Sequence, residues 1–401
     1  MAGHGLKAGE KKAVAIVGST GSIGRSTLDV IRANPARFRV VALAAGRNTG
    51  LLKRQIREFS PAFVSVLTED AAKDVARHFP YLRRAVGFGT LGASRAAAHG
   101  EADITVSAIV GAAGFLPTLA AIKAGHDVAL ANKETLVMGG ALVMGEARKM
   151  GVRMLPVDSE HSAVFQALQG HRLRDVKRII LTASGGPFLR TALKGIRKAT
   201  PAEALAHPTW SMGRRITVDS ATLMNKAFEV IEARWLFGVT PDKIAVCVHP
   251  QSVVHSMVEY IDGSIVAQMG SSDMKGPIAY ALAYPERINA PVKPFDITGK
   301  TLTFLKPDPR RFPCLGLAYS AMELGETAAS VLNAADEVCV EEFLKGTIGF
   351  TDIYGTVASV LEGHRPWKVK TVDDILEADR WAREAARNFI MKGKCRGGRS
   401  I

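Results

Sequence analysis

A glycine-rich turn near the start of the chain constrains the fold more than any other feature of the sequence. The turn, residues 18–24 (GSTGSIG), directly follows the apolar run 13–17 and precedes a helical pattern at 25–32. A second apolar run follows at 38–44. Glycine at every third position of a strand-to-helix turn lets the backbone approach a pyrophosphate, which then faces the helix N-terminus. The segment predicts the start of a Rossmann-like sheet that binds a dinucleotide, with a purely structural turn as the alternative.

The residues after the second predicted strand indicate which dinucleotide binds. Enzymes that prefer NAD usually carry Asp or Glu there, ~20 residues after the glycines, to hold the ribose hydroxyls. Here the sequence reads Gly46-Arg47-Asn48, without an acid. A guanidinium can pair with a 2′-phosphate through two hydrogen bonds, whereas a carboxylate would repel it. We therefore favour NADPH; the alternative is that Arg47 is a solvated loop residue.

The order of the predicted elements divides the chain into four regions. Strands and helices alternate over residues 1–156, which predicts a Rossmann-like, doubly wound parallel sheet in an α/β protein. A central α+β region (157–289) contains a strand at 177–183, a helix at 221–237 and a hairpin. A proline-rich linker (290–313) and a C-terminal helical bundle (314–401) follow. The strands expected in the first region are 13–17, 38–44, 63–67, 85–88, 104–109, 128–131 and 152–156.

Composition excludes some classes of protein. The formal net charge is +14, but the basic residues are dispersed and not interleaved with aromatic residues, so we expect no nucleic-acid binding. A basic field also suits phosphorylated ligands. No apolar run approaches the ~20 residues that span a bilayer, and no signal-peptide pattern precedes the first strand. Four cysteines without a CxxC pair are typical of free thiols, so we expect a cytoplasmic protein without membrane association.

Two acids directly follow the last strand of the first region. In the segment Val157-Asp158-Ser159-Glu160-His161, an extended backbone would project Asp158 and Glu160 to the same side. Adjacent carboxylates repel each other unless a proton or a cation lies between them. Oxygen ligands favour Mg²⁺ or Mn²⁺. The segment predicts a candidate metal site, although two acids in a polar loop can also simply be solvated.

A third carboxylate lies on a predicted helix. We expect Ser220 at the start of this helix, where free backbone N–H groups bind anions. The spacing of Asn225, Lys226 and Glu229 places an amide, an ammonium and a carboxylate on one helix face. The alternative is an exposed polar stripe with a surface ion pair.

Two further loops have the composition of ligand-binding segments. The strand ending near Ala183 continues into Ser184-Gly185-Gly186, which suits a phosphate nest. The segment 207–213 (HPTWSMG) combines an aromatic side chain, a flexible thioether and a glycine, which is typical of a lid that closes over a substrate. Alternatively, Trp210 packs into the core.

These motifs together resemble the 1-deoxy-D-xylulose 5-phosphate reductoisomerase family. The resemblance covers about residues 12–390 in the family's order, and it is most specific at the segment 207–213 and the two acidic motifs. The chain is shorter than several relatives between His161 and Leu181, where we expect a surface loop. The matching segments are 18–24, 131–134, 156–163, 181–188, 207–213, 218–229, 249–258 and 333–353.

The resemblance implies roles for individual residues. The metal ligands would be Asp158, Glu160 and Glu229. The catalytic residues, which contact the reacting carbons and hydroxyls, would be Lys133, Glu160, His207 and Glu229, joined by Ser159 in substrate binding. The substrate phosphate would be held by Ser184, Ser220, Asn225 and Lys226. The residues closing over the substrate would be Trp210 and Met212, with His255 near the site in a role that the sequence leaves open. The NADPH contacts would be Gly18, Thr20, Gly21, Ser22, Ile23, Gly24, Gly46, Arg47, Asn48, Asn132, Glu134 and Gly213.

The resemblance also implies the chemistry. A sugar phosphate, 1-deoxy-D-xylulose 5-phosphate, would rearrange on Mn²⁺ or Mg²⁺ (with Co²⁺ a further candidate), and NADPH would reduce the branched aldehyde to 2-C-methyl-D-erythritol 4-phosphate. This reaction belongs to non-mevalonate isoprenoid precursor synthesis, and the family suggests a homodimer. Two rivals are a semialdehyde-phosphate reductase, which needs a nucleophilic cysteine, and a non-catalytic NADPH sensor. Cys247 lies inside an apolar run, which disfavours the first, and a sensor has no need of three carboxylates with a phosphate site.

Overall fold

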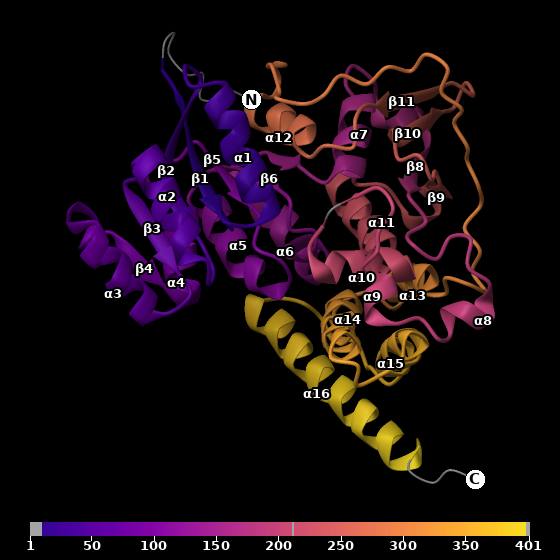
Figure 1. Cartoon of the computed structure of the whole chain (residues 1–401). Coiled ribbons are helices and arrows are strands. Elements are labelled where there is room, and N and C mark those ends of the chain that lie inside the picture. Colours follow the sequence, from indigo (N-terminus) through magenta and orange to yellow (C-terminus); the bar gives the residue numbers. More distant parts are fainter. Residues whose placement is uncertain (1–9, 211, 398–401) are drawn as a thin grey trace. The chain divides into compact units, whose positions relative to one another are not determined.

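The computed structural model describes residues 10–210 and 212–397, which form two compact units (Figure 1). The first unit contains the described residues up to Thr135, together with Val143–Ser162 and Asp273–Pro294. The second contains Leu136–Leu142, Ala163–Ser272 and the described residues from Phe295 onward. The four-region division predicted from the sequence stays a prediction, because compactness alone does not define where a domain begins or ends.

The first unit is built on a seven-stranded parallel sheet with the order β4-β3-β2-β1-β5-β6-β7. The chain runs from β1 outward to β4, then starts again beside β1 with β5, so the strand order reverses between β1 and β5. Ligands of such sheets bind at this reversal. All seven predicted strands are present within two residues of their expected bounds, and the predicted α/β class is confirmed. The strands are β1 (Lys12–Val17), β2 (Phe38–Ala44), β3 (Phe63–Val66), β4 (Val86–Phe88), β5 (Ile104–Ser107), β6 (Asp127–Leu130) and β7 (Met154–Pro156).

Helices connect these strands and complete the first unit. Helix α12 comes from a distant part of the chain yet packs against α1, and Lys12 Nζ donates to Leu282 O in it at 2.9 Å. Helix α6 is kinked at Gly139, where φ is −141°. The helices wholly within this unit are α1 (Ser22–Ala33), α2 (Thr49–Phe59), α3 (Glu69–His78), α4 (Gly89–Ala97), α5 (Phe115–Lys123) and α12 (Lys275–Ala283). Helices α6 (Glu134–Met150) and α7 (Ser159–Ala167) each have residues in both units.

The second unit contains a four-stranded mixed sheet with the order β11-β10-β8-β9. Strands β8 and β9 are parallel, and β10 runs antiparallel to both β8 and β11. The predicted hairpin is confirmed: it turns at Gly263, whose φ of +86° only glycine adopts readily. The strands are β8 (Val176–Ala183), β9 (Ile244–Val248), β10 (Val254–Tyr260) and β11 (Ile265–Met269).

The helix predicted at residues 221–237 is confirmed over Met224–Phe237, but its first two residues belong to a separate preceding helix. Helix α10 (Arg214–Thr222) ends where Leu223 adopts a left-handed conformation with φ of +62°, and α11 (Met224–Phe237) starts immediately afterwards. Met224 N, at the start of the second helix, donates a hydrogen bond to the Thr222 hydroxyl at 3.2 Å. Ser220 therefore lies in the last turn of α10, and the expectation that it starts a helix was wrong.

The rest of the second unit is helical around a single apolar core. Residues 290–313 form no regular element apart from a bridge between Leu305 and Val248, as the prolines predict. Helix α14 is buried along most of its length between α13, α15 and α16 (Figure 1). Among the described helices, none is both long and apolar enough to cross a membrane. The remaining helices are α8 (Leu193–Ile196), α9 (Pro201–Ala204), α13 (Cys314–Leu324), α14 (Ala328–Leu344), α15 (Phe350–Glu362) and α16 (Val372–Gly397).

Candidate active site

The glycine turn between β1 and α1 needs glycine because backbone segments pack tightly around it. A Cβ on Gly18 would lie 2.4 Å from Ala108 O, and φ at this residue is +97°. A Cβ on Gly24 would lie 2.3 Å from Gly18 O. Gly21 occupies the N-cap of α1, and among the described residues no side chain caps this helix and no acid stands in its first turn. The first N–H groups of α1 are thus suited to an anion at the point where the strand order reverses.

A residue that the sequence analysis missed holds this turn in place. Gln55 on α2 accepts a hydrogen bond from Ser19 Oγ and donates one to Ser19 O, both at 2.9 Å. At the end of β2, Gly46, Arg47 and Asn48 are all exposed, and Asn48 Oδ1 caps α2 by accepting from Leu51 N at 3.0 Å. No local signal marks a single glutamine in a helix as a support for a distant turn.

Asn132 and Glu134 are buried supports for the loop after β5. Asn132 Nδ2 donates to Gly111 O at 3.0 Å and also to Ile109 O. Glu134 Oε1 accepts from Gly111 N at 3.1 Å. The two side chains, which the resemblance assigns to cofactor contacts, therefore shape the loop beside the strand-order reversal.

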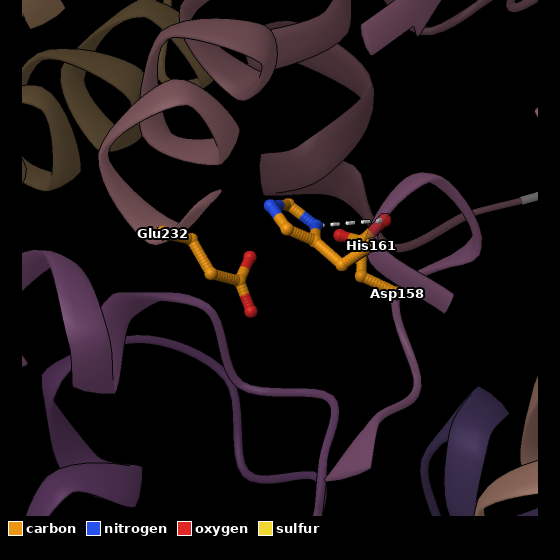
Figure 2. Close-up of side chains that lie close together, drawn as sticks. All are labelled: Asp158, His161 and Glu232. Carbon is orange, nitrogen blue, oxygen red and sulfur yellow. Dashed lines mark ion pairs between the residues drawn. The ribbon is translucent and has the colours of Figure 1, made fainter. Parts of the chain in front are cut away.

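The acidic motif of the first unit forms the start of α7, so the extended backbone predicted for it was wrong. Ser162 N donates to Asp158 O at 2.8 Å, which closes the first helical turn. Asp158 pairs with Lys133, and both side chains are at least nine-tenths buried. Ser159 Oγ donates to Glu160 Oε2 at 2.6 Å. His161 Nδ1 lies 4.0 Å from Asp158 Oδ1, the ion pair dashed in Figure 2.

The polar face predicted on α11 is confirmed. Asn225 Nδ2 donates to Glu229 Oε1 at 2.7 Å, and Lys226 Nζ donates to the other carboxylate oxygen. Lys226 and Glu229 are 3% and 1% exposed, so the alternative of a solvated surface pair is wrong. Figure 2 also labels Glu232, a fully buried acid one turn further along α11 that the sequence analysis missed. Glu232 lies three residues after Glu229 and thus on the same helix face, and this spacing could have identified it from the sequence.

The segment after β8 packs closely against the end of α10. Gly185 and Gly186 have φ of +84° and +65°, and a Cβ on Gly186 would lie 2.7 Å from Ser220 O. Ser184 Oγ accepts a hydrogen bond from Gly186 N at 3.2 Å. Ser184 and Ser220, which are distant in sequence, are therefore brought to one region of the second unit.

The hydrogen bonds of His207 define its tautomer. Its Nδ1 accepts from Trp210 N at 2.9 Å and from Thr209 N at 3.2 Å. The proton therefore resides on Nε2, which donates to Ser184 Oγ at 2.9 Å. Burial lowers the pKa of His207, which favours this neutral form.

Trp210 and His255 lie next to each other in the second unit. Their ring centroids are 6.4 Å apart, and Trp210 is half-buried, in contrast to a core residue. Burial is the largest cause that lowers the pKa of His255, to about 4, and electrostatic repulsion from His249 and Lys226 lowers it further. Hydrogen bonds with the backbone act in the opposite direction. Met212 is half-buried and Gly213 is the N-cap of α10, whereas Ser211 of this loop lies outside the described residues.

Comparison with known families identifies the chain. The model of 1-deoxy-D-xylulose 5-phosphate reductoisomerase matches residues 14–140, and that of its C-terminal domain matches residues 154–237. A model described as DXP reductoisomerase C-terminal domain matches residues 269–385. Together, in chain order, they span most of the sequence. The chain belongs to the 1-deoxy-D-xylulose 5-phosphate reductoisomerase family.

Full-length relatives agree with this assignment. The 1-deoxy-D-xylulose 5-phosphate reductoisomerase of Geobacter metallireducens is 57% identical over 380 residues, which cover 94% of this chain and 99% of that protein. The Chlorobaculum tepidum relative of the same name is 54% identical over 380 residues, covering 94% and 100% of the two chains.

Solved structures of the family share the fold. A reductoisomerase from Zymomonas mobilis in complex with NADPH is 42% identical, covers 95% of this chain and 99% of its own, and has a TM-score of 0.88. A DOX-P reductoisomerase in complex with NADPH, fosmidomycin and magnesium is 41% identical, covers 96% and 99%, and has a TM-score of 0.89.

Proposed function

We propose that this chain catalyses the NADPH- and divalent-cation-dependent conversion of 1-deoxy-D-xylulose 5-phosphate to 2-C-methyl-D-erythritol 4-phosphate, in non-mevalonate isoprenoid precursor synthesis. The observation that carries the proposal is full-length family membership at 57% identity to a reductoisomerase. The polar residues described above include the chemical groups that this reaction requires.

NADPH fits the glycine turn and the end of β2. The N-terminus of α1, which no described side chain caps, offers backbone N–H groups to the pyrophosphate. Arg47 is exposed at the position where the 2′-phosphate would lie, and a Cβ on Gly46 would meet open space among the described residues. We assign the cofactor contacts to the twelve residues that the resemblance implies, with Asn132 and Glu134 acting through the loop after β5 and Asn48 also capping α2.

We assign the divalent cation to Asp158, Glu160 and Glu229, the three ligands that the resemblance implies. The donor set consists of carboxylate oxygens alone, which suits Mg²⁺ or Mn²⁺ and also accommodates Co²⁺. Two of the acids already hold cationic partners, Lys133 on Asp158 and Lys226 on Glu229. Buried carboxylates require a positively charged partner, and a bound cation can serve as that partner.

The substrate phosphate is assigned to Ser184, Ser220, Asn225 and Lys226. Ser184 Oγ accepts hydrogen bonds from His207 Nε2 and Gly186 N, so its own proton is directed to a further acceptor. The ammonium of Lys226 supplies the opposite charge, and its burial strengthens that interaction. These groups bind and orient the phosphate end of the sugar.

The remaining residues act on the reacting end of the substrate. When bound, the cation polarises the carbonyl and hydroxyl oxygens of the sugar, and NADPH supplies the hydride. Lys133 and His207 present N–H groups, Ser159 orients Glu160, and the half-buried Trp210 and Met212 exclude water from the site. His255 lies beside Trp210 and is uncharged at neutral pH, so it contributes an uncharged side chain to the substrate-binding region.

We also propose a cytoplasmic homodimer. Cys247, Cys314 and Cys339 form no disulfide among the described residues, which suits a reducing compartment. The dimer follows from the family resemblance, and sedimentation velocity tests it. We keep the sequence-based boundaries: a cofactor domain (1–156), a catalytic domain (157–289), a linker (290–313) and a helical domain (314–401).

Turnover with defined substrates tests the function. Purified protein with Mg²⁺ and 1-deoxy-D-xylulose 5-phosphate should oxidise NADPH, followed at 340 nm, and mass spectrometry should identify methylerythritol phosphate. Omission of the sugar phosphate or chelation of the metal should stop the reaction. NADPH binding without turnover would contradict the proposal and favour a sensor. Activity on a semialdehyde phosphate instead would favour a cysteine-dependent reductase, which the pKa of Cys247, raised by burial, disfavours.

A second assay tests the shared phosphate site. The branched aldehyde 2-C-methylerythrose 4-phosphate, supplied with NADPH, should be reduced by the same enzyme. Lys226→Ala should lower the efficiency with either substrate by roughly tenfold or more, because both carry the same phosphate. Rejection of the aldehyde by an enzyme that converts deoxyxylulose phosphate would contradict a stepwise rearrangement and reduction.

A further inference from the structure

A buried ion-pair network joins α10 to α14, and none of the roles assigned above uses it. Its centre is Arg215, in the first turn of α10, whose side chain is 15% exposed. Arg215 Nη1 donates to Glu337 Oε1 at 2.6 Å, and Nη2 donates to Asn333 Oδ1 at 2.9 Å. Nη2 also lies 3.5 Å from Asp336 Oδ2, and Nε lies 3.6 Å from Asp219 Oδ2. One guanidinium therefore meets four side chains from two helices.

The network contains more carboxylates than guanidinium groups, so each guanidinium must be held close to several carboxylates at once. Asp336 is fully buried, and burial raises the pKa of its carboxyl to about 6 even though Arg215 and a hydrogen bond to Asp219 lower it. Glu337 is shared with Arg383, which reaches it from α16. Buried charges of this kind add little net stability, but displacing one partner leaves the others uncompensated. The network therefore favours one placement of α10 against α14.

Helix α10 has proposed ligand-binding residues at both ends. Gly213 is its N-cap and accepts a hydrogen bond from Thr217 N at 3.1 Å. Ser220, in the last turn, directly follows Asp219 of the network. Its backbone packs so closely against Gly186 that a Cβ on Gly186 would lie 2.7 Å from Ser220 O. Because α10 is only nine residues long, a shift at Arg215 moves both of its ends.

We propose that Arg215 is a positioning residue, which holds α10 against α14 and thereby sets how well Ser220 meets the substrate phosphate. The inference rests on the function proposed above and adds a residue that does not touch the substrate. Arginine suits the task because its planar fork donates in several fixed directions at once, whereas lysine provides a single point of charge.

The substitution Arg215→Lys tests the proposal, because it keeps the positive charge and removes the fork. We expect the KM for 1-deoxy-D-xylulose 5-phosphate to rise about tenfold, while kcat changes less than about threefold. Binding is also measured without turnover, from the concentration of inorganic phosphate that raises the midpoint of thermal unfolding. That concentration should rise by a similar factor. A lower unfolding midpoint with an unchanged KM and unchanged phosphate response would show a merely structural role and overturn the proposal.

Arg383→Lys is the matched control. Arg383 pairs with the same Glu337 on α14 and with Asp379 on α16, so these contacts do not involve α10. This variant should lower the unfolding midpoint and keep the wild-type KM. An equal rise in KM in both variants would attribute the effect to the helical region as a whole, and would overturn the assignment to Arg215.

A milder variant keeps the proposal testable should Arg215→Lys fail to fold. Asn333→Ala removes one neutral acceptor and leaves every charged partner of the network in place. Its KM should rise about threefold, and an unchanged KM with an unchanged phosphate response would overturn the proposal. The wild-type assay keeps the two proposals apart. If the wild-type protein does not convert the sugar phosphate, the proposed function fails, whereas the phosphate comparison among variants still decides the role of Arg215.

Discussion

Acidification from pH 7.5 to pH 5 should destabilise the protein through His255. This side chain is 6% exposed, and burial is the largest cause that lowers its pKa from 6.5 to about 4. The folded state therefore keeps the ring neutral at pH values where the unfolded chain binds a proton. Because the unfolded state binds more protons between pH 6.5 and about pH 4, the contribution is fully present above this window and lost as the pH falls.

The size of the effect follows from the two pKa values. At about 1.36 kcal/mol per pH unit, a fall from 6.5 to about 4 amounts to about 3 kcal/mol when titration is complete. At pH 5, where only part of the window has been crossed, the loss is about 2 kcal/mol. An effect of this size is a large fraction of the stability of a typical domain.

Urea unfolding of the wild type and of His255→Gln at pH 7.5, 6 and 5 measures this loss. The glutamine side chain stays uncharged over this range, so the free energy of unfolding of the variant should fall about 2 kcal/mol less than that of the wild type between pH 7.5 and 5. Because the two proteins differ only at residue 255, pH-dependent contributions from the rest of the chain cancel in the comparison. Parallel pH dependence of the two proteins would refute the reasoning, since His255 would then titrate near 6.5 in the folded state.

Other predictions concern the cofactor, the metal, the loop and the turn. Arg47→Asp should weaken NADPH about ten- to a hundredfold more than NADH in steady-state assays, and an unchanged preference would exclude the 2′-phosphate contact. Glu229→Gln should abolish most turnover at limiting Mg²⁺ while NADPH binding, measured by fluorescence, persists. Trp210→Ala should raise the KM for the sugar phosphate, whereas an intact KM would identify a packing residue. Gly24→Ala should impair NADPH binding and lower the unfolding midpoint, because its Cβ would lie 2.3 Å from Gly18 O; wild-type behaviour in both would contradict the close packing.

Much of the fold was predictable because its signals are local. Continuous apolar runs such as 13–17 mark parallel strands, since helices cover both faces of such a sheet. The polar face of α11 was predictable for the same reason, because residues three and four apart on a helix are neighbours wherever the helix lies. The family resemblance added the identities of ligand-binding residues, which spacing alone leaves open.

Other features depend on contacts between segments far apart in the chain. Helix α10 ends at Leu223, a residue whose side chain gives no turn signal, and the extended segment predicted at Asp158 is the start of a helix. The tautomer of His207 depends on Ser184, twenty-three residues away, and on a loop that folds back on its ring. Such pairings are specific to the assembled unit, and no local pattern encodes them.

The sequence thus determines where the strands of the parallel sheet form and which polar groups share a helix face, since these follow from periodicity within a few residues. Only the tertiary structure decides which of those groups are buried together. Glu229 and Lys226 could have been an exposed pair, and Arg215 an ordinary surface residue. Packing removes water from both, and removal of water turns a weak surface interaction into a strong geometric constraint. That difference in solvation separates a polar stripe from a candidate catalytic site.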